Sequence, residues 1–145
     1  MNDQELLSGS ALAVFKLNGQ FLALAEEPAA PAGLTAAWWQ VLGAVLPAPL
    51  PVAGVAREMG ITRQSMQRIA DILVERGLAE YRDNPAHRRA KLLAVTEHGR
   101  AAVSRIGPAH AVAAMALATK LGRSALAEAL AALRALSAAL DDLAA

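Results

Sequence analysis

The residues of this chain that could do chemistry are polar side chains gathered in the segment 61–76. Arginine and glutamine can form paired hydrogen bonds with guanine and adenine edges in the major groove of DNA. Apolar residues recur every three or four positions through the same segment, which predicts a helix with one buried face. A polar first half also fits an ordinary solvated helix face. The polar residues outside the apolar face are Arg63, Gln64, Ser65, Gln67 and Arg68.

The residues just before this segment predict a helix-turn-helix. Pro51 suits the first position of a short preceding helix, where its missing N–H costs nothing. Gly60 can adopt the left-handed conformation that ends a helix, and Thr62 can cap the next one. In a helix-turn-helix the second helix, called the recognition helix below, enters the major groove.

A basic hairpin is expected directly after the recognition helix. Segments 78–83 and 90–95 can each be extended, and Asp83-Asn84-Pro85 suits the turn between them. A two-stranded hairpin in this position is the wing of a winged helix, which contacts phosphates or the adjacent minor groove. The residues expected to carry the wing contact are His87, Arg88, Arg89 and Lys91.

The residues at 60–68, 84–92 and 96–99, together with 34–42 before them, resemble the multiple-antibiotic-resistance regulator (MarR) family. The resemblance covers nearly the whole chain. It implies a mainly α fold with a small β-hairpin, a winged helix-turn-helix with N- and C-terminal dimerisation helices. It also implies a homodimeric transcriptional regulator, a repressor, that binds pseudo-palindromic double-stranded DNA. The corresponding division of the chain is 1–30 (N-terminal dimerisation helix), 31–99 (DNA-binding domain) and 100–145 (C-terminal dimerisation helices).

The wing departs from the family pattern at one position. Many members carry an aspartate two residues before the arginine that enters the minor groove, and the two side chains form a salt bridge. Here His87 precedes Arg89, and a neutral histidine cannot form that salt bridge. The departure leaves the pose of the wing arginine open.

The two ends of the chain are apolar and helical in pattern. Segment 5–25 predicts an amphipathic helix, and Thr96 can cap a long helix that Gly107-Pro108 bends or breaks. After Gly122, leucines spaced three and four apart predict one apolar stripe. The stripe fits an intramolecular core or, as the resemblance implies, a dimer interface. Its members are Leu126, Leu130, Leu133, Leu136, Leu140 and Leu143.

Trp38 and Trp39 are adjacent, so on a helix they point about 100° apart and cannot face one core layer together. Both can be structural, one beneath the recognition helix and the other against the long arm. Alternatively, one lines a pocket beside Phe15 or Phe21. The family resemblance implies a small aromatic effector that binds in such a pocket, shifts the spacing of the two lobes and lowers DNA affinity.

Length and composition agree with a single domain plus helical arms. The chain has 145 residues, of which 55% are hydrophobic and only 3% aromatic, with a net charge of +1. Basic residues are concentrated in 57–100, with nine Lys/Arg against six Asp/Glu, whereas the rest has five against seven. The absence of cysteine excludes thiol redox sensing and fits a cytoplasmic protein. No signal peptide is evident, and the apolar stretch 109–121 is too short for a membrane span.

No enzyme, metal site or cofactor is expected. The histidines at 87, 98 and 110 have no metal-ligand spacing, and the serines lack a nucleophile motif. Two other functions stay open beside DNA-binding regulation. The winged helix can mediate protein–protein contacts without specific DNA binding, and the arms can belong to a helical scaffold.

Overall fold

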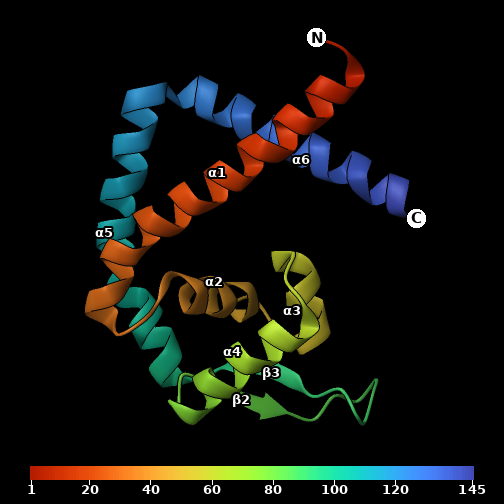
Figure 1. The fold of residues 1–145 in the computed structure, drawn as a ribbon. Helices are drawn as coiled ribbons and strands as arrows, with labels where there is room; N and C mark the ends of the chain where they lie inside the picture. The colour runs from red at the N-terminus through yellow and green to blue at the C-terminus, as the bar shows by residue number, and fades with distance from the viewer. The chain divides into compact units, whose positions relative to one another are not determined.

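Helices dominate the computed structural model, which describes all residues 1–145, and the three short strands form one antiparallel sheet (Figure 1). The mainly α winged-helix prediction is confirmed. The chain divides into two compact units, Met1–Gly107 and Pro108–Ala145, which are described separately. The elements are α1 (Asp3–Ala29), the short 3₁₀ helix η1 (Ala30–Ala32), α2 (Ala36–Val45), β1 (Leu50–Pro51), α3 (Val52–Met59), α4 (Arg63–Glu75), β2 (Ala79–Arg82), β3 (Leu92–Val95), α5 (Glu97–Leu121) and α6 (Arg123–Ala144).

The helix-turn-helix is α3 and α4, and its turn has the predicted signals. Gly60 is left-handed, with φ 65°, and its N–H donates to carbonyls of the last turn of α3. The Thr62 hydroxyl oxygen accepts a hydrogen bond from the Ser65 amide at 3.1 Å and caps α4. The predicted apolar face of α4 is confirmed, because Met66, Ala70 and Leu73 are buried in the core.

One prediction about Pro51 is wrong. Its backbone is extended, with φ −63° and ψ 148°, so α3 begins at Val52 and Pro51 is only its N-cap. Leu50 and Pro51 pair with Leu93 and Leu92, which adds a strand that the sequence did not predict. The sheet therefore has the order β1-β3-β2, with Pro51 on an edge strand where it need not donate to a neighbour.

The wing is the connection between β2 and β3, and it extends beyond the sheet (Figure 1). Both strands are shorter than the predicted 78–83 and 90–95, and Tyr81 pairs with Leu93. Asn84 is the one buried polar residue. Its side-chain oxygen accepts from the Ala86 amide at 3.0 Å, and its carbonyl accepts from the His87 amide at 3.2 Å. These bonds order the first part of the wing.

The start of α5 is fastened to the turn that follows the recognition helix. The Thr96 hydroxyl donates to the Gly77 carbonyl at 2.6 Å and accepts from the Gly99 amide at 3.0 Å, so the predicted cap is confirmed. The Thr96 amide donates to the Leu78 carbonyl at 3.2 Å. A Cβ on Gly99 would lie 2.0 Å from that carbonyl oxygen, so the contact requires glycine.

The arms are longer and more continuous than predicted. α1 begins before the predicted 5–25 range because the Asn2 side chain and the Glu5 carboxylate cap each other's backbone. A bend or a break was predicted at Gly107-Pro108, and α5 is not broken there, although the boundary between the two units falls at this point.

The stretch 109–121 belongs to the 25-residue α5, which is long enough for a membrane span, so the prediction from the length of the stretch is wrong. By length and composition α5 could cross a membrane. One such helix is weak evidence of a span, because a helix of a protein outside the membrane passes the same test.

Candidate nucleic-acid interface

The outer face of α4 gathers most of the predicted base-contacting residues. A groove of about 630 Å³ is lined by Arg63, Gln64, Gln67, Arg68 and Asp71. Counted from Arg63, the others follow at one, four, five and eight positions, which places all five on one side of the helix, away from the buried Met66 and Leu73. The recognition helix therefore presents a continuous polar face with donors, acceptors and two guanidinium groups.

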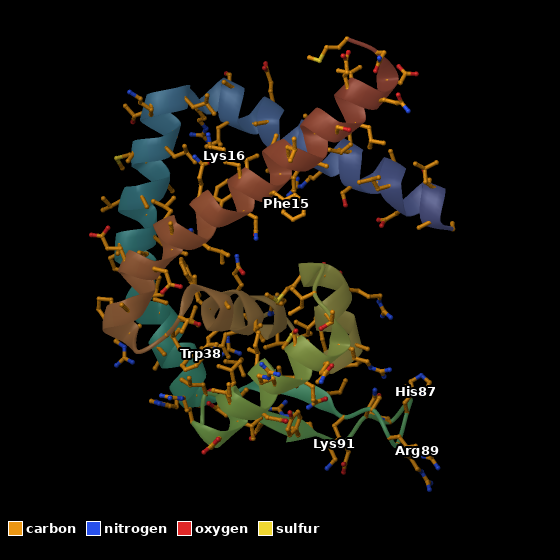
Figure 2. All side chains as sticks on the ribbon, viewed as in Figure 1. Phe15, Lys16, Trp38, His87, Arg89 and Lys91 are labelled. Atoms are coloured by element: carbon orange, nitrogen blue, oxygen red, sulfur yellow. The ribbon has the colours of Figure 1, made fainter.

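A second cavity connects this helix to the wing. It has a volume of about 440 Å³. The helix contributes Arg63 and Gln67, and the wing contributes His87, Arg89 and Lys91. His87 and Arg89 lie at the tip of the wing loop and Lys91 lies nearer to β3 (Figure 2). Residues separated by twenty or more positions in the sequence thus meet around one positively charged cavity.

Arg63 lines both of these cavities and a third one of about 440 Å³ on the α3 side. Arg57 lines that third cavity as well and was not among the predicted site residues. Arg57 lies in the last turn of α3, where a basic residue interacts favourably with the helix dipole. This structural role explains a basic residue at position 57, so the sequence did not indicate a contact with DNA. A salt bridge joins Arg82 and Glu80 at 2.8 Å, and neither residue lines these cavities.

A three-residue hydrogen-bond network crosses from α4 to β2. The Gln67 side-chain amide nitrogen donates to the Asp71 carboxylate at 3.0 Å and to the Tyr81 hydroxyl oxygen at 2.9 Å. The Tyr81 hydroxyl in turn donates to the same Asp71 oxygen. Burial first, and then the hydrogen bond to Asp71, raises the pKa of Tyr81 to about 12. Tyr81 therefore keeps its proton at neutral pH.

Sequence analysis missed Asp71 and Tyr81. One available signal was the spacing of Gln67 and Asp71, since glutamine and aspartate four positions apart on a helix form hydrogen bonds. No local signal pointed to Tyr81, because it reaches the network through the packing of β2 against α4.

Two of the predicted contact residues lie outside both cavities. The Ser65 hydroxyl accepts a hydrogen bond from the Thr62 hydroxyl at 2.9 Å and takes part in the cap of α4. Arg88 is exposed on the wing, and its side chain lines neither cavity. Their contact with DNA stays a prediction.

The four candidate effector residues are not grouped by any of the three cavities. Phe15 on α1 is 78% exposed and Phe21 is 47% exposed. Trp38 and Trp39 are half-buried and pack against the core. The Arg76 guanidinium lies 4.8 Å from the centre of the Trp38 ring, so Trp38 contacts the C-terminal end of the recognition helix. An effector pocket at these residues stays a prediction.

Comparisons with known proteins agree with this geometry. The sequence model of the MarR family matches residues 32–90. An uncharacterised protein of Mycobacterium bovis (strain ATCC BAA-935 / AF2122/97) is 46% identical over 93 residues, which are 64% of this chain. The match covers 65% of that relative's length, just under two thirds.

Solved structures share the fold over almost the whole chain. The transcriptional repressor CouR bound to a 23-mer DNA duplex is 26% identical, with a TM-score of 0.77 over 94% of this chain and 98% of that chain. CouR from Rhodococcus jostii RHA1 bound to p-coumaroyl-CoA is 23% identical, with a TM-score of 0.76 over 87% and 90%. Other structures with this fold are of MarR-family transcription regulators. The winged helix and its order of elements are those of MarR-family transcription regulators, and the DNA-binding region of this chain is similar to the MarR family in its sequence model.

Proposed function

We propose that this protein is a cytoplasmic transcriptional regulator that binds double-stranded DNA as a homodimer, and that it is a repressor acting on a pseudo-palindromic operator. The observation that carries the proposal is the basic cavity shared by Arg63 and Gln67 of the recognition helix and by His87, Arg89 and Lys91 of the wing. One duplex can supply both partners that this arrangement needs, base edges for the helix and phosphates for the wing.

The recognition helix and the wing have different roles in this proposal. Gln64, Gln67 and Arg68 lie on the exposed face of α4 and can read base edges. Arg89 and Lys91 are cationic and exposed, so they suit phosphates or the minor groove. Ser65 and Arg88 belong to the same proposal, Ser65 at the helix N-terminus and Arg88 on the wing.

The homodimer is supported by apolar surface that the single chain leaves uncovered. α6 has no buried residue, and α1 buries only Ala29. Exposed large side chains on these helices include Leu12 and Phe15 of α1 and Leu133 and Leu143 of α6. Apolar helix surface of this extent marks an association site. A two-fold symmetric partner would present two recognition helices about one DNA turn apart, with residues 1–30 and 100–145 as dimerisation segments and 31–99 as the DNA-binding domain.

Repression and release are the finer part of the proposal. CouR is a transcriptional repressor solved with a DNA duplex and with p-coumaroyl-CoA. By analogy, we place a small aromatic effector beside Phe15, Phe21, Trp38 and Trp39. An effector that binds better to the DNA-incompetent dimer would shift the population away from the operator-bound form.

Selection of bound duplexes from a random pool tests the main proposal. We expect a consensus with two inverted half-sites, and binding that weakens steeply as salt rises. An enrichment without inverted symmetry would contradict the dimeric operator. If no duplex binds even at low salt, the proposal fails, and the winged helix is then a protein-contact module.

Tryptophan fluorescence tests the effector site, because Trp38 and Trp39 are the only tryptophans. A titration with aromatic carboxylic acids and their coenzyme A thioesters should quench the emission and release the selected duplex at the same concentrations. Phe15→Ala should weaken both effects by a larger factor than it weakens DNA binding in the absence of effector, because Phe15 also lies on the proposed dimerisation helix. Release of DNA that Phe15→Ala and Trp38→Phe leave unchanged would place the effector elsewhere.

A further inference from the structure

We propose that Arg57 and Arg63 form a phosphate-binding site for the DNA backbone at the turn of the helix-turn-helix. Arg57 is then a DNA-contacting residue of α3, in addition to those of the recognition helix and the wing. The inference rests on the proposed DNA-binding function and deepens it, since it assigns a backbone contact to a helix that the predicted site leaves out.

The two arginines line one cavity of about 440 Å³ at the turn between α3 and α4, called the turn cavity below. Arg57 comes from the last turn of α3, and Arg63 is the first residue of α4. The other lining residues are small or apolar: Ala53, Ala56, Gly60 and Ile61. Two guanidinium groups around a cavity without a carboxylate favour an anion there. Phosphate suits them, because arginine can bind it through two parallel hydrogen bonds.

Both side chains of this pair are available to a ligand. Arg57 and Arg63 are exposed, and neither guanidinium forms a hydrogen bond or ion pair within the chain. The backbone amides of the turn, in contrast, are engaged. The Gly60 amide donates to the Arg57 carbonyl at 3.3 Å, and the Ile61 amide donates to the Ala56 carbonyl at 3.1 Å. A phosphate at the turn would therefore be held by the two side chains, so substitution of either one should be felt.

The turn cavity adjoins the two surfaces already assigned to DNA. Arg63 lines it together with the outer groove of α4 and the wing cavity, and Ala53 lines both the wing cavity and the turn cavity. In a helix-turn-helix complex the N-terminal residues of the second helix contact base edges, while the first helix crosses the backbone. A duplex that α4 reads would therefore bring a backbone phosphate to the side of Arg63 where Arg57 lies.

The helix dipole alone could also explain a basic residue at the end of α3, and that role needs no DNA. The two roles have different consequences. A contribution to the helix dipole changes the free energy of unfolding and is the same for every duplex. A phosphate contact changes DNA affinity, its salt dependence and its response to one particular linkage of the duplex.

Duplexes with single methylphosphonate linkages test the contact, because each substitution removes the charge of one phosphate. Wild type should lose affinity at each phosphate that it contacts. Arg57→Ala should weaken the unmodified duplex about two- to tenfold for each half-site, the range expected for one hydrogen-bonded contact. It should also make the salt slope shallower by about one unit per lost contact. The methylphosphonate effect should shrink at one linkage for Arg57→Ala, at the same linkage for Arg63→Ala, and at a different linkage for Lys91→Ala.

Arg105→Ala is the matched control, because Arg105 is exposed on α5 and lines none of the three cavities. It removes the same charge and should leave the methylphosphonate effect unchanged at every linkage. Arg57→Gln keeps a long helix-forming side chain without the charge. It therefore gives the same test if Arg57→Ala alters the circular dichroism spectrum.

The outcomes separate this inference from the proposed function. Equal methylphosphonate effects for wild type and the Arg57 variants at every linkage would overturn the inference, while DNA binding would stand. Effects at different linkages for Arg57→Ala and Arg63→Ala would assign the two arginines to separate phosphates and overturn the shared site. If wild type binds no duplex, the proposed function fails and this inference fails with it.

Discussion

At the scale of single residues, Tyr81 reports on the network that holds Gln67. It is the only tyrosine of the chain, so the absorbance change of tyrosinate follows this group alone. The pKa of Tyr81, about 12, predicts a titration midpoint well above the ordinary 10.0. Asp71→Ala should lower the midpoint but not to the ordinary value, because burial is the larger cause. Gln67→Ala should raise it further, since the Gln67 hydrogen bond lowers the pKa. A midpoint that neither variant moves would contradict the network.

The same shift has a consequence for stability. Because the folded protein holds this proton more tightly than the unfolded chain, the free energy of unfolding should fall as the pH rises from 10.0 through about 12. Below that window Tyr81 contributes no pH dependence. Urea denaturation of Tyr81→Phe should lack the part of the alkaline decline that comes from this group.

Gly99 is a residue whose identity is fixed by one close approach. An added Cβ would lie 2.0 Å from the Leu78 carbonyl oxygen, so Gly99→Ala must separate α5 from the turn after α4. Forced overpacking of this kind costs about 1–3 kcal/mol, so the denaturation midpoint should fall clearly. Gly107→Ala is the matched control in the same helix, since nothing lies within 4 Å of its added Cβ. An unchanged midpoint for Gly99→Ala at equal protein concentration would show that α5 and the turn can move apart without a loss of stability.

At the scale of elements, substitutions in the recognition helix and in the wing should affect DNA binding differently. Gln64 lines the outer groove of α4, so Gln64→Ala should relax sequence preference. Lys91 lines the cavity at the wing, so Lys91→Ala should weaken all duplexes alike and make the salt slope shallower by about one unit per lost contact. Binding to selected and random duplexes across a salt series measures both effects. Indistinguishable results for the two variants would contradict the assignment of helix and wing.

The wing also predicts how DNA binding depends on the residue at position 87. His87 shares its cavity with Arg63, Arg89 and Lys91. His87→Asp should keep DNA affinity by pairing with Arg89. Binding titrations of wild type, His87→Asn and His87→Asp measure the effect. Identical curves for wild type and His87→Asn would remove His87 from the mechanism.

Local chemistry decided which elements could be predicted from sequence. Gly60, Thr62 and Thr96 were predictable as end and cap residues because each acts within a few positions of itself. The strand at Leu50–Pro51 was not, since two residues carry no periodicity and their partners lie about forty positions away. For α5 the sequence left a bend or a break at Gly107-Pro108 open, and the helix is continuous there. A proline removes one backbone hydrogen bond of a helix, and the other hydrogen bonds of a 25-residue helix can keep the helix continuous at Pro108.

The same limit applies to the site. The residue types on α4 and the wing predicted which side chains would be polar and exposed, and the structure places five of them around one cavity. The Gln67–Asp71–Tyr81 network depends on the packing of β2 beside α4. Its long-range hydrogen bonds connect residues that no local pattern relates.

At the scale of the whole molecule, the proposal depends on what covers the C-terminal stripe. Leu133 is 38% exposed and Leu143 is 82% exposed, although the spacing of the leucines is that of an interface. If a second chain covers the stripe, Leu133→Glu would bury an unpaired charge there, at a cost of several kcal/mol. We expect monomers or aggregates by light scattering, and loss of affinity for a palindromic duplex.

A control with the same change of charge distinguishes disruption of a dimer interface from a loss of helix stability. Ala135 lies two positions on, about 200° round the helix from Leu133, and is exposed. Ala135→Glu should leave the dimer and its operator affinity intact, because the new carboxylate faces solvent. Disruption by both variants would point to a loss of helix stability and not to an interface. A folded dimer of Leu133→Glu with full operator affinity would show that the subunits meet elsewhere, and the exposed leucines of α6 would then need another partner.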